Sequence, residues 1–282
     1  WEDHRSYREF LLLKHEVADG ISLQWLGCSG FQLEYEGYYV SVDPYISRVQ
    51  LNDLLLRRKA HFSSAAISAA IPHANSAILV GHTHFDHAMD VPYLAKRDGC
   101  KAYGSSSLLN LMKQSGAPEL AEVVEPNKKF EVGPFEITFV PSLHSKLVLG
   151  MAVPFHGDIS CEHFDEFLPS AYKCGQVYGI HIRVGGKTFY HQGSANLIED
   201  ALSFRNVDFL LLGISGRLFT KNYVQRIISH INPEVIIPHH FDNFFRPLSA
   251  AMEFSTNVNL TAFIEESMNI SRDVTIQTLK PV

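Results

Sequence analysis

Residues 77–91 read AILVGHTHFDHAMDV, an apolar run followed by a dense group of metal-binding residue types. The run 77–80 stops at Gly81, which is typical of a short buried strand that leaves its sheet at a turn. Four side chains that can ligate metals follow within six positions, namely His82, His84, Asp86 and His87. A lone histidine is usually an ordinary surface or core residue, but an H-x-H-x-D-H pattern directly after an apolar strand predicts a metal site.

The spacing of these residues allows two metal positions. Alternate side chains of an extended segment point the same way, so His82 and His84 can face one ion. Asp86 and His87 stand at the start of the helix expected after the turn and can face a second position beside the first. Imidazole and carboxylate groups suit zinc, manganese and iron. We expect one or two ions, Zn²⁺ by preference, with Mn²⁺ or Fe²⁺ as alternatives.

Composition narrows the class of protein. The chain has 282 residues, 46% of them hydrophobic, and we expect one domain over 1–282. A net charge of −6 with scattered Lys and Arg argues against a nucleic-acid partner, so we expect a small-molecule substrate. No apolar run is long enough to span a bilayer. We expect a cytoplasmic protein, while a first residue that is Trp1 and not Met leaves a periplasmic or secreted location open.

The four cysteines do not form a recognisable framework. They are spread along the chain without a C-x-x-C pair, at Cys28, Cys100, Cys161 and Cys174. Only the last two, which fall in one long connection, are expected to be able to pair.

Strand-like and helix-like patterns alternate in both halves of the chain. Strands are expected within 22–30, 31–37, 38–45, 76–82, 101–106, 130–142, 177–194, 207–215 and 234–240. Helical patterns cover 3–16, 51–70, 88–98, 105–115, 196–204, 219–231 and 246–253. This mixture predicts an α/β fold with two sheets packed in the middle. Two segments, 44–76 and 150–176, interrupt this alternation of strand and helix patterns, and we expect them to be lid or pocket insertions.

The metal-binding motif and its surroundings resemble the metallo-β-lactamase fold superfamily. LQWLGCSGFQLEYEGYYVSVDPY (23–45) resembles the opening hairpin of that family, and FVPSLHS (139–145) resembles the third ligand motif. GKTFYHQGSAN (186–196) and EVIIPHHFDNFFRPL (234–248) resemble the fourth and fifth motifs. The resemblance covers roughly 22–250 in the family's order. It implies the four-layer αββα sandwich, with the metal site at one edge between the two sheets.

The resemblance also implies further site residues. His144 matches the third ligand motif and His240 the fifth, whereas Ser194 stands where many members carry a metal-bridging aspartate. Either the site holds one metal, or it resembles the third subclass of metallo-β-lactamases, which also has a serine there. On the second interpretation, which we favour, the resemblance assigns His82, His84 and His144 to one ion. It assigns Asp86, His87 and His240 to the other.

Such a centre implies a zinc-type metallo-hydrolase. A metal-bound hydroxide would cleave an ester, lactone, amide or phosphodiester bond, with Asp86 as the catalytic residue that orients the nucleophile. Among relatives, the 234–248 segment resembles the branch with ascorbate-phosphate lactonase and N-acyl-phosphatidylethanolamine phospholipase. The alternatives are a catalytically silent metal-binding scaffold of the same fold and, as a minor one, a β-lactamase.

Several residues are candidates for supporting the ligands or contacting substrate. His239 and His191 are candidates for proton transfer, and Asp43 for a turn or for supporting a ligand. Arg246 is a candidate for binding a carboxylate or phosphate, and His163 for reaching the metals from a lid at 150–176. For each of these an ordinary structural role is the competing interpretation.

Overall fold

The computed structural model describes residues 2–147, 150–162, 167–256 and 258–282. The strands are β1 (Glu16–Ala18), β2 (Ile21–Gly27), β3 (Gly30–Tyr35), β4 (Tyr38–Val42), β5 (Ala77–Leu79), β6 (Lys101–Gly104), β7 (Ala121–Val123), β8 (Lys129–Val132), β9 (Phe135–Ser142), β10 (Val177–Val184), β11 (Lys187–Gln192), β12 (Phe209–Gly213), β13 (Val235–His239) and β14 (Thr275–Ile276). The α-helices are α1 (Glu2–Glu9), α2 (Leu51–Leu55), α3 (Ser64–Ala70), α4 (Phe85–Ala88), α5 (Val91–Asp98), α6 (Ser106–Gln114), α7 (Tyr223–Ile231) and α8 (Leu260–Ile270). Short 3₁₀ turns are η1 (Pro118–Leu120), η2 (Pro169–Ala171), η3 (Glu199–Ala201) and η4 (Arg217–Phe219).

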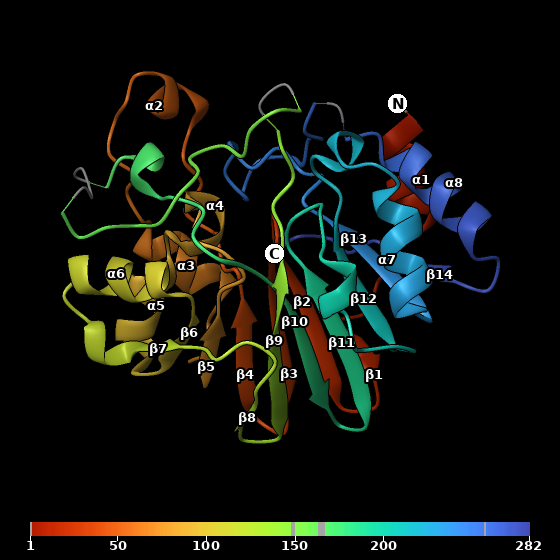
Figure 1. The fold of residues 1–282 in the computed structure, drawn as a ribbon, viewed down its shortest axis with the longest axis horizontal. Coiled ribbons are helices and arrows are strands. Elements are labelled where there is room, and N and C mark those ends of the chain that lie inside the picture. The colour runs from red at the N-terminus through yellow and green to blue at the C-terminus, as the bar shows by residue number, and fades with distance from the viewer. Residues whose placement is uncertain (1, 148–149, 163–166, 257) are drawn as a thin grey trace.

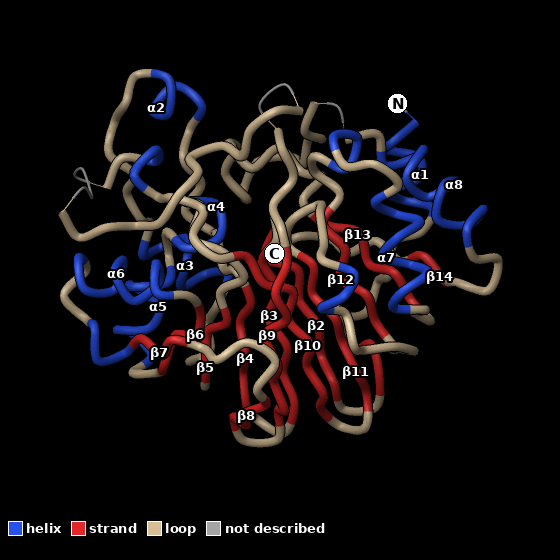
Figure 2. Tube along the Cα trace, viewed as in Figure 1, coloured by secondary structure: helices blue, strands red, loops and turns tan. Residues whose placement is uncertain are grey.

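The strands form two sheets of seven, ordered β1 to β7 and β14 to β8. In each sheet the hairpin strands pair antiparallel, and the strands joined through helices pair parallel. Both sheets stand in the middle of the molecule, with α3–α6 on one side and α1, α7 and α8 on the other (Figures 1 and 2). This arrangement confirms the expected αββα layers.

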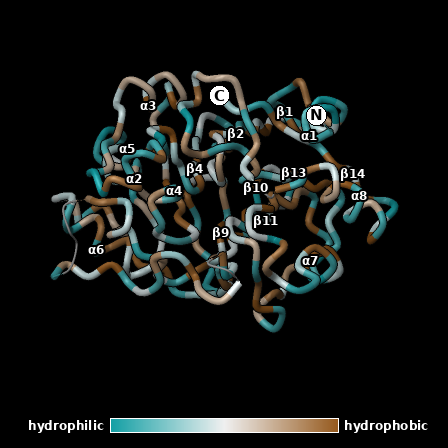
Figure 3. The backbone as a smooth tube through the Cα atoms, turned by 90° about the horizontal axis from the view of Figure 1, so that it is seen from above, coloured by the Kyte–Doolittle hydropathy of each residue, from teal (hydrophilic) through white to brown (hydrophobic). Residues whose placement is uncertain are grey.

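Apolar side chains from both sheets fill the space between them. Leu23 and Phe31 of the first sheet share one buried cluster with Ile137 and Ile180 of the second. Another buried cluster lies under the helices of the first sheet and includes Ile78 and residues of α5 and α6. Seen from above in Figure 3, the strands run through the middle, and the outer helices carry both hydrophilic and hydrophobic stretches. Strands β5 and β12 are buried along their whole length and carry no polar side chain, as expected of strands covered on both faces.

Four of the expected helices were wrong in extent. The helix expected over 3–16 ends at Glu9, because Leu12 N–H donates to Thr278 O (2.9 Å) and draws the chain to the C-terminal segment. Residues 51–70 divide into α2 and α3, 196–204 contains only η3, and 246–253 is not helical.

The sequence analysis also missed α8. This helix begins at an N-cap, Asn259, whose side chain accepts from Ala262 N–H, a signal readable in the sequence.

Among the described residues no helix is long and apolar enough to cross a membrane. All four cysteines are free thiols, so the pairing considered for Cys161 and Cys174 is wrong.

One edge of the two sheets collects the candidate site residues. In the first sheet, β4 and β5 are parallel. In the second sheet, β11 and β13 both pair parallel with β12 and so run the same way. Strand β9 also runs this way, because β9 and β11 each pair antiparallel with β10. The residues just beyond these strand ends include Asp43, His82, His144, Ser194 and His240. The turn between β2 and β3 reaches the same edge, because β3 begins where its antiparallel neighbour β4 ends.

Candidate metal centre

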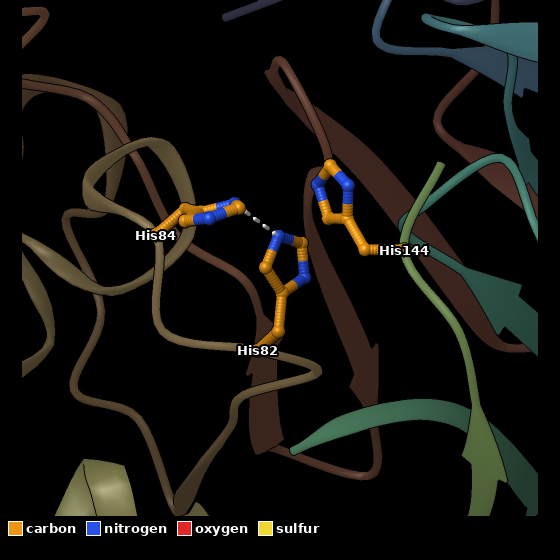
Figure 4. Close-up of side chains that lie close together, drawn as sticks. All are labelled: His82, His84 and His144. Carbon is orange, nitrogen blue, oxygen red and sulfur yellow. Dashed lines mark hydrogen bonds between the residues drawn. The ribbon is translucent and has the colours of Figure 1, made fainter. Parts of the chain in front are cut away.

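Three histidines from two segments converge at this edge. His82 and His84 follow β5, and His144 follows β9. One ring nitrogen from each lies within 4.8 Å of the others, and His82 Nε2 is 3.1 Å from His84 Nδ1. Figure 4 shows the three rings brought together from these two segments. The first ligand group of the sequence analysis is therefore adjacent in space.

Backbone carbonyls determine which ring nitrogens carry protons. His84 Nε2 is 2.8 Å from Pro154 O, and His144 Nδ1 is 2.7 Å from Ser145 O. A carbonyl oxygen only accepts hydrogen bonds, so these two nitrogens are the donors. The lone pairs are then on His84 Nδ1 and His144 Nε2, as coordination of a shared ion requires. The donor set fits a divalent ion such as zinc.

Burial keeps these histidines neutral. Desolvation and the neighbouring rings lower the pKa of His82 well below its usual value. The same causes lower the pKa of His84 to about 3. Desolvation likewise lowers the pKa of His144 to about 4. Neutral imidazole is the form that binds metals.

A second group of ligand atoms lies beside the first. Asp86 Oδ2 is 3.2 Å from His240 Nε2 and 3.7 Å from His87 Nε2. Cys28 Sγ lies 3.6 Å from the same carboxylate oxygen and 3.5 Å from His240 Nε2. Cys28, Asp86 and His240 thus offer three ligand atoms within 4.8 Å of one another.

Sequence reasoning missed Cys28, although a signal was available. The hairpin motif that carries Cys28 ends at Asp43, a residue already considered for the site. Strands β2, β3 and β4 pair antiparallel in sequence, so the turn between β2 and β3 lies at the same edge of the sheet as the end of β4. Cys28 is in that turn, and Asp43 follows the end of β4.

Asp43 contacts the ring nitrogen of His87 that faces away from Asp86. Its Oδ2 is 2.8 Å from His87 Nδ1, and its Oδ1 accepts from Gly81 N–H at 2.7 Å. This bond leaves His87 Nε2 facing Asp86. Burial opposes protonation of His87, but the carboxylates of Asp43 and Asp86 outweigh it and raise its pKa.

Asp86 is held ionised in spite of its burial. Desolvation raises its pKa, but His87 and a hydrogen bond with His240 together hold the pKa far below the usual range. A buried carboxylate with positive partners stays charged. Asp86 therefore presents a negative charge between the two ligand groups.

The remaining candidates lie around these groups. Ser194 Oγ accepts from Ser145 N–H (3.3 Å), so it lies behind His144. His191 and His239 are buried and stack on each other, with ring centroids 5.0 Å apart. Arg246 forms an ion pair with Glu253. His163 lies outside the described residues.

A cavity of about 410 Å³ opens beside the histidine group. Of the three histidines only His144 lines it, together with the ammonium of Lys146 and the imidazole of His156. No acidic side chain is among the described residues that line it. The cavity is large enough for a small-molecule substrate.

The order of these site segments along the chain matches a known family. The family model described as "Beta-lactamase superfamily domain" matches residues 22–240. The chain belongs to the β-lactamase superfamily. The match to this superfamily includes every ligand candidate named above.

Individual relatives of this superfamily member are distant. A UPF0173 metal-dependent hydrolase of Anaeromyxobacter is 26% identical over 231 residues, which cover 78% of this chain and 74% of the relative. One from Pyrococcus furiosus is 26% identical over 241 residues, covering 83% and 89%. Igni18, a metallo hydrolase from Ignicoccus hospitalis, shares the fold with a TM-score of 0.56 at 18% identity, covering 93% and 95%.

Proposed function

We propose that this β-lactamase superfamily member is a metal-dependent hydrolase that cleaves an ester, lactone, amide or phosphodiester bond. One observation carries the proposal: ring nitrogens of His82, His84 and His144 lie within 4.8 Å of one another, and carbonyls hold the protons of His84 and His144 on their opposite nitrogens. Metal-dependent hydrolases among the similar chains are consistent with it. A bound divalent ion supplies an activated water nucleophile and polarises the bond to be cleaved.

The second ion of the proposed pair belongs to Asp86, His87 and His240. His87 Nε2 and His240 Nε2 both face Asp86 Oδ2, at 3.7 and 3.2 Å. Zinc suits both groups, because all of these ligands are imidazoles or carboxylates. Asp86 lies beside His87 and His240, so its ionised carboxylate can orient the attacking water by accepting a hydrogen bond from it.

The cavity beside His144 favours an anionic substrate. Lys146 and His156 line it, and the described lining residues include no carboxylate to oppose an anion. A phosphate or carboxylate near the scissile bond would be attracted to the Lys146 ammonium. The 234–248 segment resembles the branch with ascorbate-phosphate lactonase and N-acyl-phosphatidylethanolamine phospholipase. This resemblance and the positive charge of Lys146 together favour lactones and phosphodiesters as substrates.

The test is metal content together with turnover. Metal-free protein is reloaded with Zn²⁺, and ions per chain are measured beside hydrolysis of a chromogenic phosphodiester and a chromogenic lactone. His84→Ala removes one nitrogen of the first group, and we expect turnover to fall by more than about 100-fold. His15→Ala, at an exposed histidine, is the control and should retain wild-type turnover. Stable metal binding without turnover of either substrate would favour the silent scaffold instead.

A further inference from the structure

We propose that the Cys28 thiolate is a ligand of the second ion, beside Asp86 and His240. The inference rests on the proposed function, because it concerns an ion of the same centre. It adds a sulfur ligand, contributed by the turn between β2 and β3, to a set predicted from imidazoles and carboxylates alone.

The side chain of Cys28 points at the other two ligands. Its Sγ is 3.6 Å from Asp86 Oδ2 and lies beside the His240 ring, 3.5 Å from Nε2 and 3.7 Å from Nδ1, while Nε2 and Asp86 Oδ2 are 3.2 Å apart. A turn of the His240 ring about its Cβ–Cγ bond lets Nε2 and Sγ share one ion. The three side chains are buried, with Cys28 fully so. A single ion can lie between three atoms at such separations, since zinc binds sulfur at about 2.3 Å and nitrogen or oxygen at about 2.0–2.2 Å.

The backbone of Cys28 is fixed independently of its thiol. Its N–H donates to the carboxylate of Asp242 at 3.0 Å, and its carbonyl accepts from Trp25 Nε1 (3.0 Å) and His240 N–H (2.9 Å). Asp242 is in turn paired with the buried guanidinium of Arg48 at 2.9 Å. These bonds hold the Cα–Cβ vector of Cys28 in place, so the thiol is preorganised toward Asp86 and His240.

The backbone of Cys28 has a conformation that glycine adopts more readily than cysteine. Its φ of +50° lies in the left-handed region, where glycine or asparagine is more stable than a cysteine. A turn that needed only this backbone shape would be satisfied by glycine, as at the preceding Gly27 (φ +78°). Backbone strain that persists at a functional site is commonly part of that site.

A sulfur ligand changes which ions the second position prefers. Thiolates favour zinc and cobalt over manganese and magnesium, which prefer oxygen. When the ion binds, the Cys28 S–H bond breaks, a sulfur–metal bond forms, and the proton leaves to solvent. The second position is then selective for zinc-like ions.

The test uses Co²⁺ as the probe, because a thiolate ligand produces a charge-transfer absorption band that imidazole and carboxylate do not. Metal-free wild-type protein is titrated with Co²⁺, and absorption and ions bound per chain are followed together. We expect a thiolate band that grows with the second ion. Cys28→Ser should lose the band and bind the second ion about 10- to 100-fold more weakly. Cys100→Ser, another buried cysteine, should keep both.

Four results would overturn the inference, and they separate it from the proposed function. Two bound cobalt ions without a thiolate band, or a band that survives in Cys28→Ser, would refute a Cys28 ligand and leave the hydrolase intact. One bound ion without a band would refute the ligand and the second ion but leave the histidine group. A wild-type chain that binds no cobalt would refute both proposals. If Cys28→Ser does not fold, the absence of a thiolate band from the wild-type spectrum still refutes the inference.

Discussion

Replacing Asp43 by asparagine isolates the contribution of a buried carboxylate that touches no proposed ion directly. Asp43 is fully buried and accepts from Gly81 N–H and from His87 Nδ1. Asparagine has the same shape, but it carries one acceptor and one donor group. If its oxygen keeps the bond to Gly81, its amide N–H faces His87 Nδ1. The His87 proton then moves to Nε2, the nitrogen that faces Asp86.

The expected magnitude follows from that change of tautomer. A protonated Nε2 cannot coordinate, so His87 must first give up its preferred hydrogen bond. Loss of a residue that orients a metal ligand typically weakens metal binding about 10- to 100-fold, or roughly 1.4–2.7 kcal/mol. We expect Asp43→Asn to weaken the second Zn²⁺ by this amount. The first ion should be affected less. The ligand atom of His82 lies within 4.8 Å of an Asp43 oxygen, but the hydrogen bonds described for Asp43 go to Gly81 and His87 and not to the three histidines of the first group.

Calorimetric titration of metal-free protein with Zn²⁺ measures both affinities. Asp98→Asn is the matched control: Asp98 also has a buried carboxylate, which accepts from Asn75 N–H (2.9 Å) away from the metal centre. The reasoning is refuted if Asp43→Asn binds two zinc ions with wild-type affinity. Equal weakening of both ions would refute the separation of the two ligand groups.

Three further predictions concern the turn, the acid response and the cavity. Gly27→Ala would place a Cβ 1.9 Å from Arg48 Nη2, so we expect a loss of about 3–5 kcal/mol in the free energy of unfolding, measured by denaturant titration. The pKa of His144 is about 4 in the folded chain against 6.5 as the ordinary value, so unfolded chains bind its proton first. The metal-free protein should therefore lose stability as the pH falls from 6.5 to about 4, and His144→Gln should flatten that slope in pH-dependent unfolding. Lys146→Ala should raise KM for an anionic phosphodiester about 10-fold and leave a neutral ester unchanged in steady-state assays, because only the anion gains from the ammonium. An equal change for both substrates would contradict a charge role for Lys146.

The layers of the fold were predictable because the strands carry strong local signals. Runs such as 76–82 and 207–215 are apolar and end at glycine or polar turns, and both are strands near those bounds. The helices were less predictable where tertiary contacts decide them. Residues 10–15 leave the helical pattern because the backbone pairs with the C-terminal segment, which local periodicity does not reveal.

The candidate site was predictable where ligands cluster in sequence or match a family motif. His82 and His84 needed only their spacing, whereas placing His144 and His240 depended on the resemblance. The Cys28 thiol was not predicted, because a single cysteine between Gly27 and Ser29 has no ligand spacing of its own. Only the pairing of β2, β3 and β4 brings it to the candidate ligands Asp86 and His240.

The carbonyl of Pro154, in the long connection 150–176, affects the tautomer of His84. Pro154 O holds the proton of His84 on Nε2, so the position of that loop decides which nitrogen of the ring is free. Any partner or substrate that displaces Pro154 would release the ring to rotate or exchange its proton. Thermodynamic reciprocity then requires that whatever binds His84 Nδ1 also favours the present loop position. The position of the 150–162 backbone and the tautomer of His84 are thus coupled, and protection of that backbone from hydrogen exchange would report on both.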